Sequence, residues 1–531
     1  MNTQEILKFC IERGFLLDKE VLSMFNETND VESVKLIIEK IKDSTNQRII
    51  TKSLFNQNKE KVFQILSNLP KENQQQLEGL KIKLGLSIEI LREVSKPEKE
   101  EKQEENLNQI SDEVKVSFPI LGRTKKLEVG DFTKHFRNRV SEMKKILQEN
   151  SSLKNLVSIN KLSGNRQSIS IIGIVSSKTI TKNKNIIFEV EDLTGKIKVL
   201  VSPSNATLYE KTEEICLDSV LGFSGFGNSE IIFCSQIVFP DSFLAERKKS
   251  PFDENVLFLG DIHYGSSLFL EDNFLRFIDY LNGKVPNTPE VEKIKYLVIV
   301  GDIIAGVGTY PTQERELKIK DIEEQFIGLT NLLSKIRKDI KIIISPGNHD
   351  GVRLMEPQPP LNEKYAWSIY NLKNVILTGN PAYVNLGAKG IFSGFDILTY
   401  HGVSFHYYAN SVPKLIHEGG VNAPNKIMAY LLQNRHLAPS HSSIQYFPSE
   451  EDFLMIKKIP DILVSGHTHK SAVAYYNNIL TISTSSWESK TPYQEKMGNH
   501  PDFCKVPMLN LKTRTVKILD FEDYEKKGEE K

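Results

Sequence analysis

The sequence has little cysteine, no long apolar run and no net charge. Its four cysteines form no CxxC pair, which argues against both a disulfide framework and a thiolate zinc site. No stretch approaches the roughly 18 apolar residues of a membrane span, and the opening MNTQEILKFC has no basic segment leading into an apolar run. We therefore expect a cytoplasmic protein with no membrane partner.

The net charge of the chain does not indicate what kind of partner it binds. Lysine plus arginine and aspartate plus glutamate both number 68, so the whole chain carries no hint of a polyanion partner. Any contact with nucleic acid must come from local patches or from another subunit. The length of 531 residues and the apolar content of 39% predict a globular protein of two to four domains.

The first part of the chain divides into a helical module and a charged connection. Residues 1–95 place apolar side chains at helical spacing, as in VESVKLIIEKIK, and predict a small helical N-terminal module whose function is not legible. Residues 96–165 are expected to be a charged linker and a connecting helix. The segment EKEEKQEE, with seven charged residues in eight, cannot bury enough surface to fold alone.

Residues 166–248 switch to short strand-like runs separated by turn residues. About five such runs predict a small all-β barrel, and GIVSSKTITKNKNIIFEVEDLTGKIKVLV resembles an OB-fold of the tRNA-anticodon type. Lys178, Lys182 and Lys184 could follow a phosphate backbone. Few aromatic residues alternate with them, so a protein-binding platform is slightly favoured over a surface for single strands.

Residues 252–525 alternate apolar strand-like runs with helical segments and predict an α/β layered domain. The polar loops after five of those runs carry aspartate, asparagine or histidine residues. Successive loops lie 41 to 66 positions apart, and each has a glycine beside these residues. Such spacing allows all five loops to reach one edge of a sheet. They read GDIHYG (Asp261, His263), GDII (Asp302), GNHD (Asn348, His349, Asp350), YHG (His401) and GHTH (His467, His469).

This series of loops resembles the calcineurin-like metallophosphoesterases, whose fold is a two-sheet α/β sandwich with a dinuclear metal centre. The resemblance implies that one ion binds Asp261, His263 and His469, and that the second binds Asn348, His401 and His467. Asp302 would bridge the two ions. Two divalent ions can activate a water, hold phosphoryl oxygens and neutralise developing charge. Imidazole and carboxylate ligands suit Mn, Fe, Zn or Ni.

His349 is implied to be the catalytic residue, which protonates the leaving oxygen or stabilises the five-coordinate phosphorus. Many family members place a second acid three positions after the aspartate of the GD motif, and that acid orients this histidine. Here the position is Ala305. We therefore expect another group, a water or the backbone to orient His349.

Segments between the metal motifs resemble the small subunits of the archaeal D-family DNA polymerases over roughly residues 165–520. The most specific are GVGTYPTQERELKIKDIEEQF, SPGNHDGVRLMEPQPP and STSSWESKTPYQEKMGNHPDFCKVPMLNL. The resemblance implies a 3′→5′ exonuclease that hydrolyses the terminal phosphodiester of DNA for proofreading. It also implies a large catalytic subunit as partner, DNA with a single-stranded 3′ end as substrate, the sliding clamp as a further partner, and a place at the archaeal nucleoid.

Two other functions remain open from the sequence. One is a structural scaffold of the polymerase whose metal site is vestigial, which Ala305 mildly favours. The other is a different metallophosphoesterase, such as a phosphomonoesterase or a protein phosphatase, because these enzymes share the metal motifs.

Overall fold

The structure is a computed structural model that describes residues 2–13, 16–17, 34–35, 38–39, 49–50, 114–119, 126–496 and 498–522. The chain divides into two compact units, Met1–Gln109 and Ile110–Lys531. In the first unit, helix α1 spans Asn2–Glu12, and strand β1 (Leu16–Leu17) pairs in parallel with β2 (Ile49–Ile50). Most of the predicted helical module and the linker of residues 96–112 lie outside the described residues.

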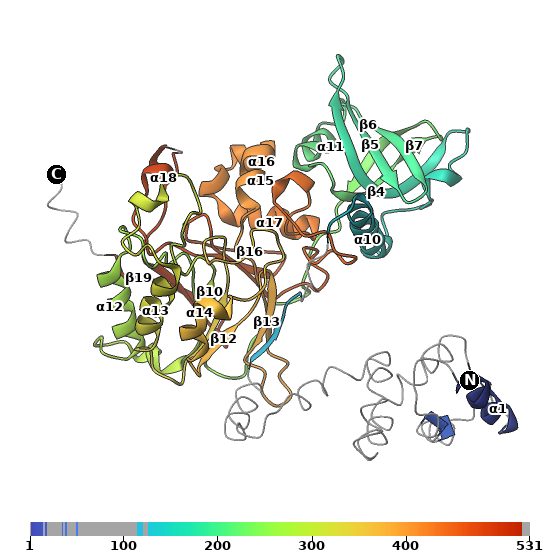
Figure 1. Ribbon diagram of the computed structural model, residues 1–531. Helices are drawn as coiled ribbons and strands as arrows, with labels where there is room; N and C mark the ends of the chain where they lie inside the picture. The colour runs from blue at the N-terminus through green and yellow to red at the C-terminus, as the bar shows by residue number, and fades with distance from the viewer. Residues whose placement is uncertain are drawn as a thin grey trace. The chain divides into compact units, whose positions relative to one another are not determined.

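The second unit contains two six-stranded mixed sheets (Figure 1). The first sheet has the order β12-β11-β10-β9-β18-β19, and its strands β9 to β12 run parallel. Their bounds are β9 Asn255–Leu259, β10 Ile294–Val300, β11 Lys341–Ser345, β12 Val375–Leu377, β18 Lys505–Asn510 and β19 Val516–Asp520. The short apolar runs predicted in this region form the central strands.

The second sheet has the order β16-β17-β15-β14-β13-β3. Its strands are β13 Ala382–Leu386, β14 Phe395–Thr399, β15 Ile462–Ser465, β16 Ala472–Tyr476, β17 Ile479–Ser483 and β3 Val114–Ser117. Apolar side chains of both sheets share one core, among them Val256 and Phe258 of β9 and Ile397 of β14. This sandwich buries one face of each sheet against the other.

Strand β3 lies within residues 96–165, the range in which the sequence predicts a charged linker and a connecting helix. It pairs antiparallel with β13, and its Val114 is 5% exposed in the core between the sheets. Four residues of alternating pattern are too short to stand out in a sequence. The edge of the second sheet therefore comes from far outside the predicted α/β domain.

Helices cover the outer face of each sheet. On the first sheet lie α12 (Glu271–Leu281), α13 (Ile322–Leu333) and α14 (Glu363–Tyr370), and on the second lie α15 (Phe405–Ser411), α16 (Pro413–His417) and α17 (Pro424–Asn434). Helix α12 buries Phe274, Phe277 and Leu281 on one side. The remaining short helices are α18 Pro492–Lys496, η3 Pro289–Lys293, η4 Gln313–Arg315, η5 Gly420–Asn422 and η6 His441–Ser443.

A closed five-stranded barrel of order β4-β5-β6-β8-β7 lies between β3 and β9 in the sequence. Its strands are β4 Gln167–Ile180, β5 Ile186–Asp192, β6 Gly195–Val201, β7 Val220–Gly227 and β8 Ile231–Val238, with α11 (Ala206–Lys211) and η2 (Thr212–Glu214) after β6 and η1 (Ile159–Lys161) before β4. Phe188 and Phe223 fill its interior. The small barrel predicted from the strand-like runs is thus present.

Helix α10 (Val129–Gln148) joins the barrel to the sandwich. Val140, Met143 and Leu147 pack against barrel residues, and Met455 of the sandwich joins the same cluster. Arg139 is 2% exposed and donates through Nε to Asp452 at 2.6 Å. No helix in the described parts of the chain has the length and apolarity that a membrane span needs.

Candidate metal centre

The five loops singled out in the sequence meet at the carboxyl ends of their strands. Asp261 and His263 follow β9, Asp302 follows β10, and Asn348 and His349 follow β11, all in the first sheet; His401 follows β14 and His467 and His469 follow β15, in the second sheet. Because these strands run parallel within each sheet, their ends lie along one rim of the sandwich. The structure brings all eight predicted site residues together there.

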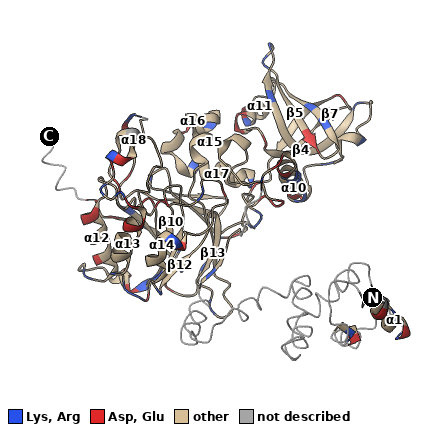
Figure 2. Ribbon diagram, in the orientation of Figure 1, with Lys and Arg blue, Asp and Glu red and all other residues tan. Residues whose placement is uncertain are grey.

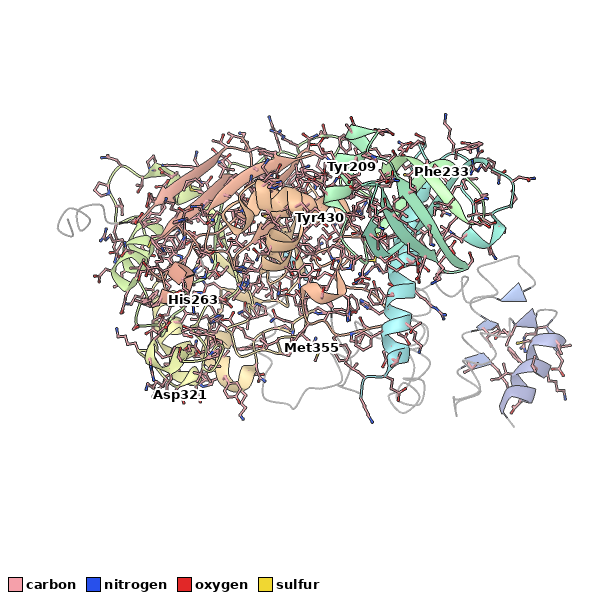
Figure 3. All side chains as sticks on the ribbon, turned by 90° about the horizontal axis from the view of Figure 1, so that it is seen from above. Tyr209, Phe233, His263, Asp321, Met355 and Tyr430 are labelled. Atoms are coloured by element: carbon pink, nitrogen blue, oxygen red, sulfur yellow. The ribbon has the colours of Figure 1, made fainter. Side chains whose placement is uncertain are left out.

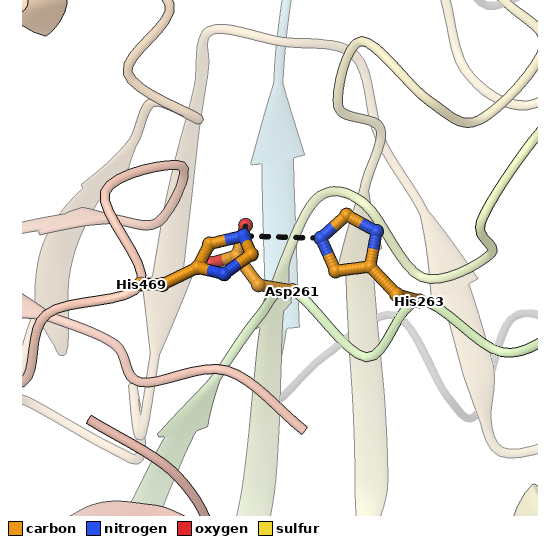
Figure 4. A group of neighbouring side chains, drawn as sticks. All are labelled: Asp261, His263 and His469. Atoms are coloured by element: carbon orange, nitrogen blue, oxygen red, sulfur yellow. Dashed lines mark hydrogen bonds and ion pairs between the residues drawn. The ribbon is translucent and has the colours of Figure 1, made fainter. Parts of the chain in front are cut away.

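Distances within the cluster match those between ligands that share an ion. Nε2 of His263 lies 3.1 Å from Nε2 of His469, and Figure 4 shows the two rings turned toward each other beside Asp261. Nε2 of His401 lies 3.1 Å from both Asp302 Oδ2 and Asn348 Oδ1. Ligands about 2.1 Å from one ion at tetrahedral to right angles stand about 3.0–3.4 Å apart. The donor set therefore fits divalent metal ions.

The same residues form two groups, and a third group that contains Asp302 connects them. Asp261, His263 and His469 make one group, and Asp302, His401 and His467 make another, each with ligand atoms within 4.8 Å of one another. Asp302 also lies within that distance of His263 and His349. Its carboxylate thus stands between the two groups.

The backbone of the loops is held in an uncommon conformation. Asp261, His263, Asp302, His467 and His469 all have positive φ angles between 48° and 66°. Non-glycine residues rarely adopt this left-handed region, and functional sites are where such residues cluster. The neighbouring chain passes very close, since a Cβ added to Gly347 would lie 2.2 Å from Asp302 Oδ1. Glycine at that position is required for the approach.

Contacts at Nδ1 orient two of the imidazoles, and for His401 the contact also leaves Nε2 free. His401 donates from Nδ1 to the carbonyl of Val300 at 3.0 Å, which leaves Nε2 for a metal. The side-chain amide of Gln494 lies 2.8 Å from Nδ1 of His469 and holds that ring from behind. These outer contacts orient the rings before any ion binds.

Burial keeps three of the histidines neutral, which is the form that binds metal. It lowers the pKa values of His263 and His467 well below the usual range and lowers the pKa of His469 to about 3. Burial would also lower the pKa of His401, but the carboxylates of Asp302 and Asp261 outweigh it and raise that pKa to about 10. In the metal-free protein the His401 ring is therefore protonated on both nitrogens and positively charged, and a bound cation would replace that charge.

His349 is oriented by the backbone of the residue that replaces the family's second acid. Its Nδ1 lies 2.7 Å from the carbonyl oxygen of Ala305, and its own backbone N–H donates to Asp302 Oδ1 at 2.8 Å. A carbonyl oxygen only accepts, so Nδ1 carries the proton. The Nε2 atom then faces the cluster, 3.9 Å from Asp302 Oδ2. Of the three orienting groups that the sequence left open, the structure has the backbone.

Asp350, the last residue of the GNHD loop, ties two of the loops together. Its carboxylate accepts from the backbone N–H of Ile304 at 3.1 Å and from that of Gly347 at 2.7 Å. Burial, followed by the charge of Asp302, raises the pKa of Asp350 to about 7. Asp350 therefore supports the loops and is not counted among the ligands.

A pocket of about 280 Å³ opens over the cluster and includes residues that sequence reasoning missed. His406 lines the pocket, and its ring centroid lies 5.1 Å from that of His467. It lacks the neighbouring glycine that marks the five predicted loops. Glu488 also lines it, bonded to the hydroxyl of Ser266, and burial raises its pKa to about 7. Both come from helices or loops after the strands, where spacing gives no signal.

Trp487, Arg435 and His436 have structural roles outside the pocket. Trp487 is fully buried against Phe274 and Phe277 and packs in the core. Arg435 and His436 neither face solvent nor lie in the pocket. Arg435 donates to the carbonyl groups of Ile456 and Lys457, and His436 contacts Asp452, so both hold the end of α17 in place.

Comparisons with known proteins agree with the motifs. Residues 254–471 match the calcineurin-like phosphoesterase family. The DNA polymerase II small subunit of Methanothermobacter thermautotrophicus is 38% identical over 398 residues, which cover 74% of this chain and 80% of that protein. The Archaeoglobus fulgidus subunit is 33% identical over 80% of this chain and 85% of that protein.

The DNA polymerase II small subunit of Pyrococcus furiosus is 37% identical over 413 residues, which cover 76% of this chain. The aligned part spans 65% of the length of that relative. With the metal motifs, the fold and these identities together, the chain belongs to the family of archaeal DNA polymerase II small subunits and contains a calcineurin-like phosphoesterase domain.

Proposed function

We propose that this chain is the exonuclease subunit of a two-subunit DNA polymerase and removes nucleotides one at a time from the 3′ end of DNA. The observation that carries the proposal is the cluster of the seven predicted metal ligands and His349, six of which line one pocket. A scaffold has no need for buried, strained loops that hold neutral imidazoles around shared carboxylates. The relatives named as polymerase small subunits supply the class of substrate.

The chain's residues would hold two divalent ions. Asp261, His263 and His469 would hold one ion, Asn348, His401 and His467 would hold the other, and Asp302 would contribute its carboxylate to both; the closeness of these side chains supports this assignment. When bound, the ions supply Lewis-acid charge to the phosphoryl oxygens and lower the pKa of an attacking water. No lysine or arginine is among the described residues that line the pocket, so this charge is what would hold the phosphodiester.

The protein's own part in the reaction is to hold the ions and to supply one proton to the leaving oxygen. His349 presents Nε2 to the pocket while Ala305 holds its Nδ1–H. As the water oxygen bonds to phosphorus and releases a proton to solvent, the bond from phosphorus to the penultimate 3′-oxygen breaks, and the form of His349 that is protonated on both ring nitrogens gives that oxygen its Nε2 proton. The products are a nucleoside 5′-monophosphate and a strand one nucleotide shorter with a free 3′-hydroxyl.

We also propose that the barrel is an OB-fold that serves mainly as a platform for the large catalytic subunit. Its closed five-stranded order supports the fold assignment. Lys178, one of the three lysines considered for phosphate contact, instead donates to the Thr212 and Ile215 carbonyls, and burial lowers its pKa. Basic and acidic residues are interspersed along the second unit (Figure 2).

The outside of the barrel has apolar groups for such a contact. Phe226 of β7 and Phe233 of β8 are directly paired across the two strands and are 53% and 41% exposed. Phe233 is marked on the barrel in Figure 3, far along the unit from His263 of the metal cluster. Co-expression with a candidate large subunit tests the platform. Co-elution that Phe233→Asp weakens is expected, and independent elution of the wild-type chains would contradict it.

The nuclease proposal is tested with purified protein, Mn²⁺ and a single strand labelled at its 3′ end. Release of labelled nucleoside 5′-monophosphate is expected, together with its loss in Asp302→Ala. No shortening, or shortening that Asp302→Ala leaves unchanged, would favour the scaffold. Phosphate release from a small aryl phosphate without loss of nucleotides from DNA would instead indicate a phosphomonoesterase or a protein phosphatase.

A further inference from the structure

The loop that follows Asp302 contains a buried glutamine that reaches the same carbonyl as His349. Gln313 is 2% exposed, at the start of η4. Its Nε2 donates to the carbonyl of Ala305 at 2.8 Å, and its Oε1 accepts from the backbone N–H of Thr309 at 3.0 Å. One side chain thus joins both ends of the turn that carries residue 305.

The Ala305 carbonyl oxygen therefore accepts two hydrogen bonds, one from Gln313 and one from Nδ1 of His349. A carbonyl has two lone pairs, so both bonds can form at once. The Gln313 amide fixes where the oxygen points, and the oxygen fixes the ring. Thr309 adds a weaker contact, since its hydroxyl lies 3.4 Å from His349 Nδ1.

We infer that Gln313 is the positioning residue for His349 and acts through the Ala305 carbonyl. The two hydrogen bonds from Gln313 and His349 to the Ala305 carbonyl orient the His349 ring, as a carboxylate at residue 305 would otherwise do. This is a neutral arrangement made from a backbone oxygen and a distant amide. This inference rests on the proposed nuclease function for its kinetic effect, although the orientation itself does not depend on that function.

The same loop offers a matched control. Gln325 of α13 is also fully buried and also holds the loop, but it does so through Gly306. Its Oε1 accepts from the Gly306 N–H at 2.9 Å, and its Nε2 donates to the Gly306 carbonyl at 3.2 Å. It makes no hydrogen bond to Ala305 among the described contacts. Gln313→Met and Gln325→Met keep the shape and remove the amides, so they separate orientation of His349 from general support of the loop.

The kinetic experiment compares these variants on DNA and on a nitrophenyl phosphodiester, whose leaving group needs no proton. Gln313→Met is expected to lower kcat on DNA roughly 10–100-fold with KM and Mn²⁺ binding unchanged, and to affect the nitrophenyl ester much less. Gln325→Met should cost less on DNA. In a His349→Ala background, Gln313→Met should have no further effect.

Equal losses in the two glutamine variants, or losses that add to that of His349→Ala, would overturn the inference. A second readout needs no activity: the ring-nitrogen resonances of His349 in metal-free protein labelled with ¹⁵N-histidine, identified by their loss in His349→Ala. The wild type should show a fixed ring with protonated Nδ1, and Gln313→Met an averaged one. Unchanged resonances in Gln313→Met would overturn the inference, whereas an inactive wild type with the expected resonances would overturn only the nuclease proposal.

Discussion

At the scale of single residues, the charge on Asp302 is the feature that the proposed metal centre depends on most. Its carboxylate is 1% exposed and lies within ligand distance of both groups of imidazoles. Asp302→Asn keeps the shape and can still accept from the His349 N–H, but it removes the charge that two cations would share. Mn²⁺ affinity should fall by more than the roughly 10–100-fold that loss of an outer hydrogen-bond partner costs.

Calorimetric titration of the metal-free protein measures this affinity. Asp279→Asn, on α12, is the control, because its side chain is 49% exposed and its carboxylate accepts from Lys284 on the surface. Mn²⁺ binding by Asp302→Asn that equals the binding of this control would show that Asp302 is not a ligand.

His436 predicts how stability changes with pH. It accepts from the Ala438 N–H at Nδ1 and lies 2.9 Å from Asp452 at Nε2, so it is neutral, and burial with the charge of Arg139 lowers its pKa to about 4. The unfolded chain takes up this proton near pH 6.5. Stability is therefore lost as the pH falls from 6.5 to 4, by about 2 kcal/mol at pH 5.

His436→Asn removes the titrating group and can keep the acceptor for Ala438. Its free energy of unfolding in urea should fall less than that of the wild type between pH 7 and pH 5, by about 2 kcal/mol. Both tryptophans, Trp367 and Trp487, lie in the sandwich, so their fluorescence follows the relevant transition in the presence of EDTA. Parallel pH profiles for the two proteins would contradict the assignment.

At the scale of elements, strand β3 is where sequence and structure differ most. Val114 points into the core between the sheets and Lys115, the next residue, is exposed. Val114→Asp buries an unpaired carboxylate and should cost at least about 3 kcal/mol, whereas Lys115→Asp should change stability by less than about 1 kcal/mol. Urea denaturation compares the two variants, and equal effects would mean that β3 is not part of the sheet.

The elements that could be predicted were those with a repeated local signal. The strands before Asp261, Asp302 and Asn348 are continuous apolar runs, as expected for parallel strands buried on both faces. The site residues follow such strands at intervals of 41 to 66 residues. The short β3 had no such signal. His406, Gln494 and Glu488 reach the pocket through packing of helices and loops, which no local pattern encodes.

The role of Ala305 illustrates the same limit within the site. The side chain carries no chemistry, and its replacement for an acid pointed only to an unknown partner of His349. The partner is the carbonyl that every residue has, fixed by an amide eight positions later. The contacts of a backbone oxygen depend on the turn, and residue types alone do not specify it.

At the scale of the whole molecule, the proposed site belongs entirely to the second unit. Both sheets, β3 included, and all eight site residues lie within Ile110–Lys531. A chain that starts at Ile110 should therefore keep its unfolding transition and its Mn²⁺ binding. A chain that starts at residue 126 loses β3 and should unfold at lower urea, because it removes Val114 and exposes the edge of β13. Equal transitions would contradict the continuity between β3 and the sandwich.

The most direct test of the account follows one strand labelled differently at its two ends during digestion by the purified protein with Mn²⁺. We predict that the 3′ label leaves first as a nucleoside 5′-monophosphate, while the 5′ label stays on products that shorten by one nucleotide at a time. Asp302→Asn should abolish both changes. Loss of the 5′ label first, internal cleavage, or no cleavage by protein that has bound its metal would contradict the proposal of a 3′→5′ exonuclease.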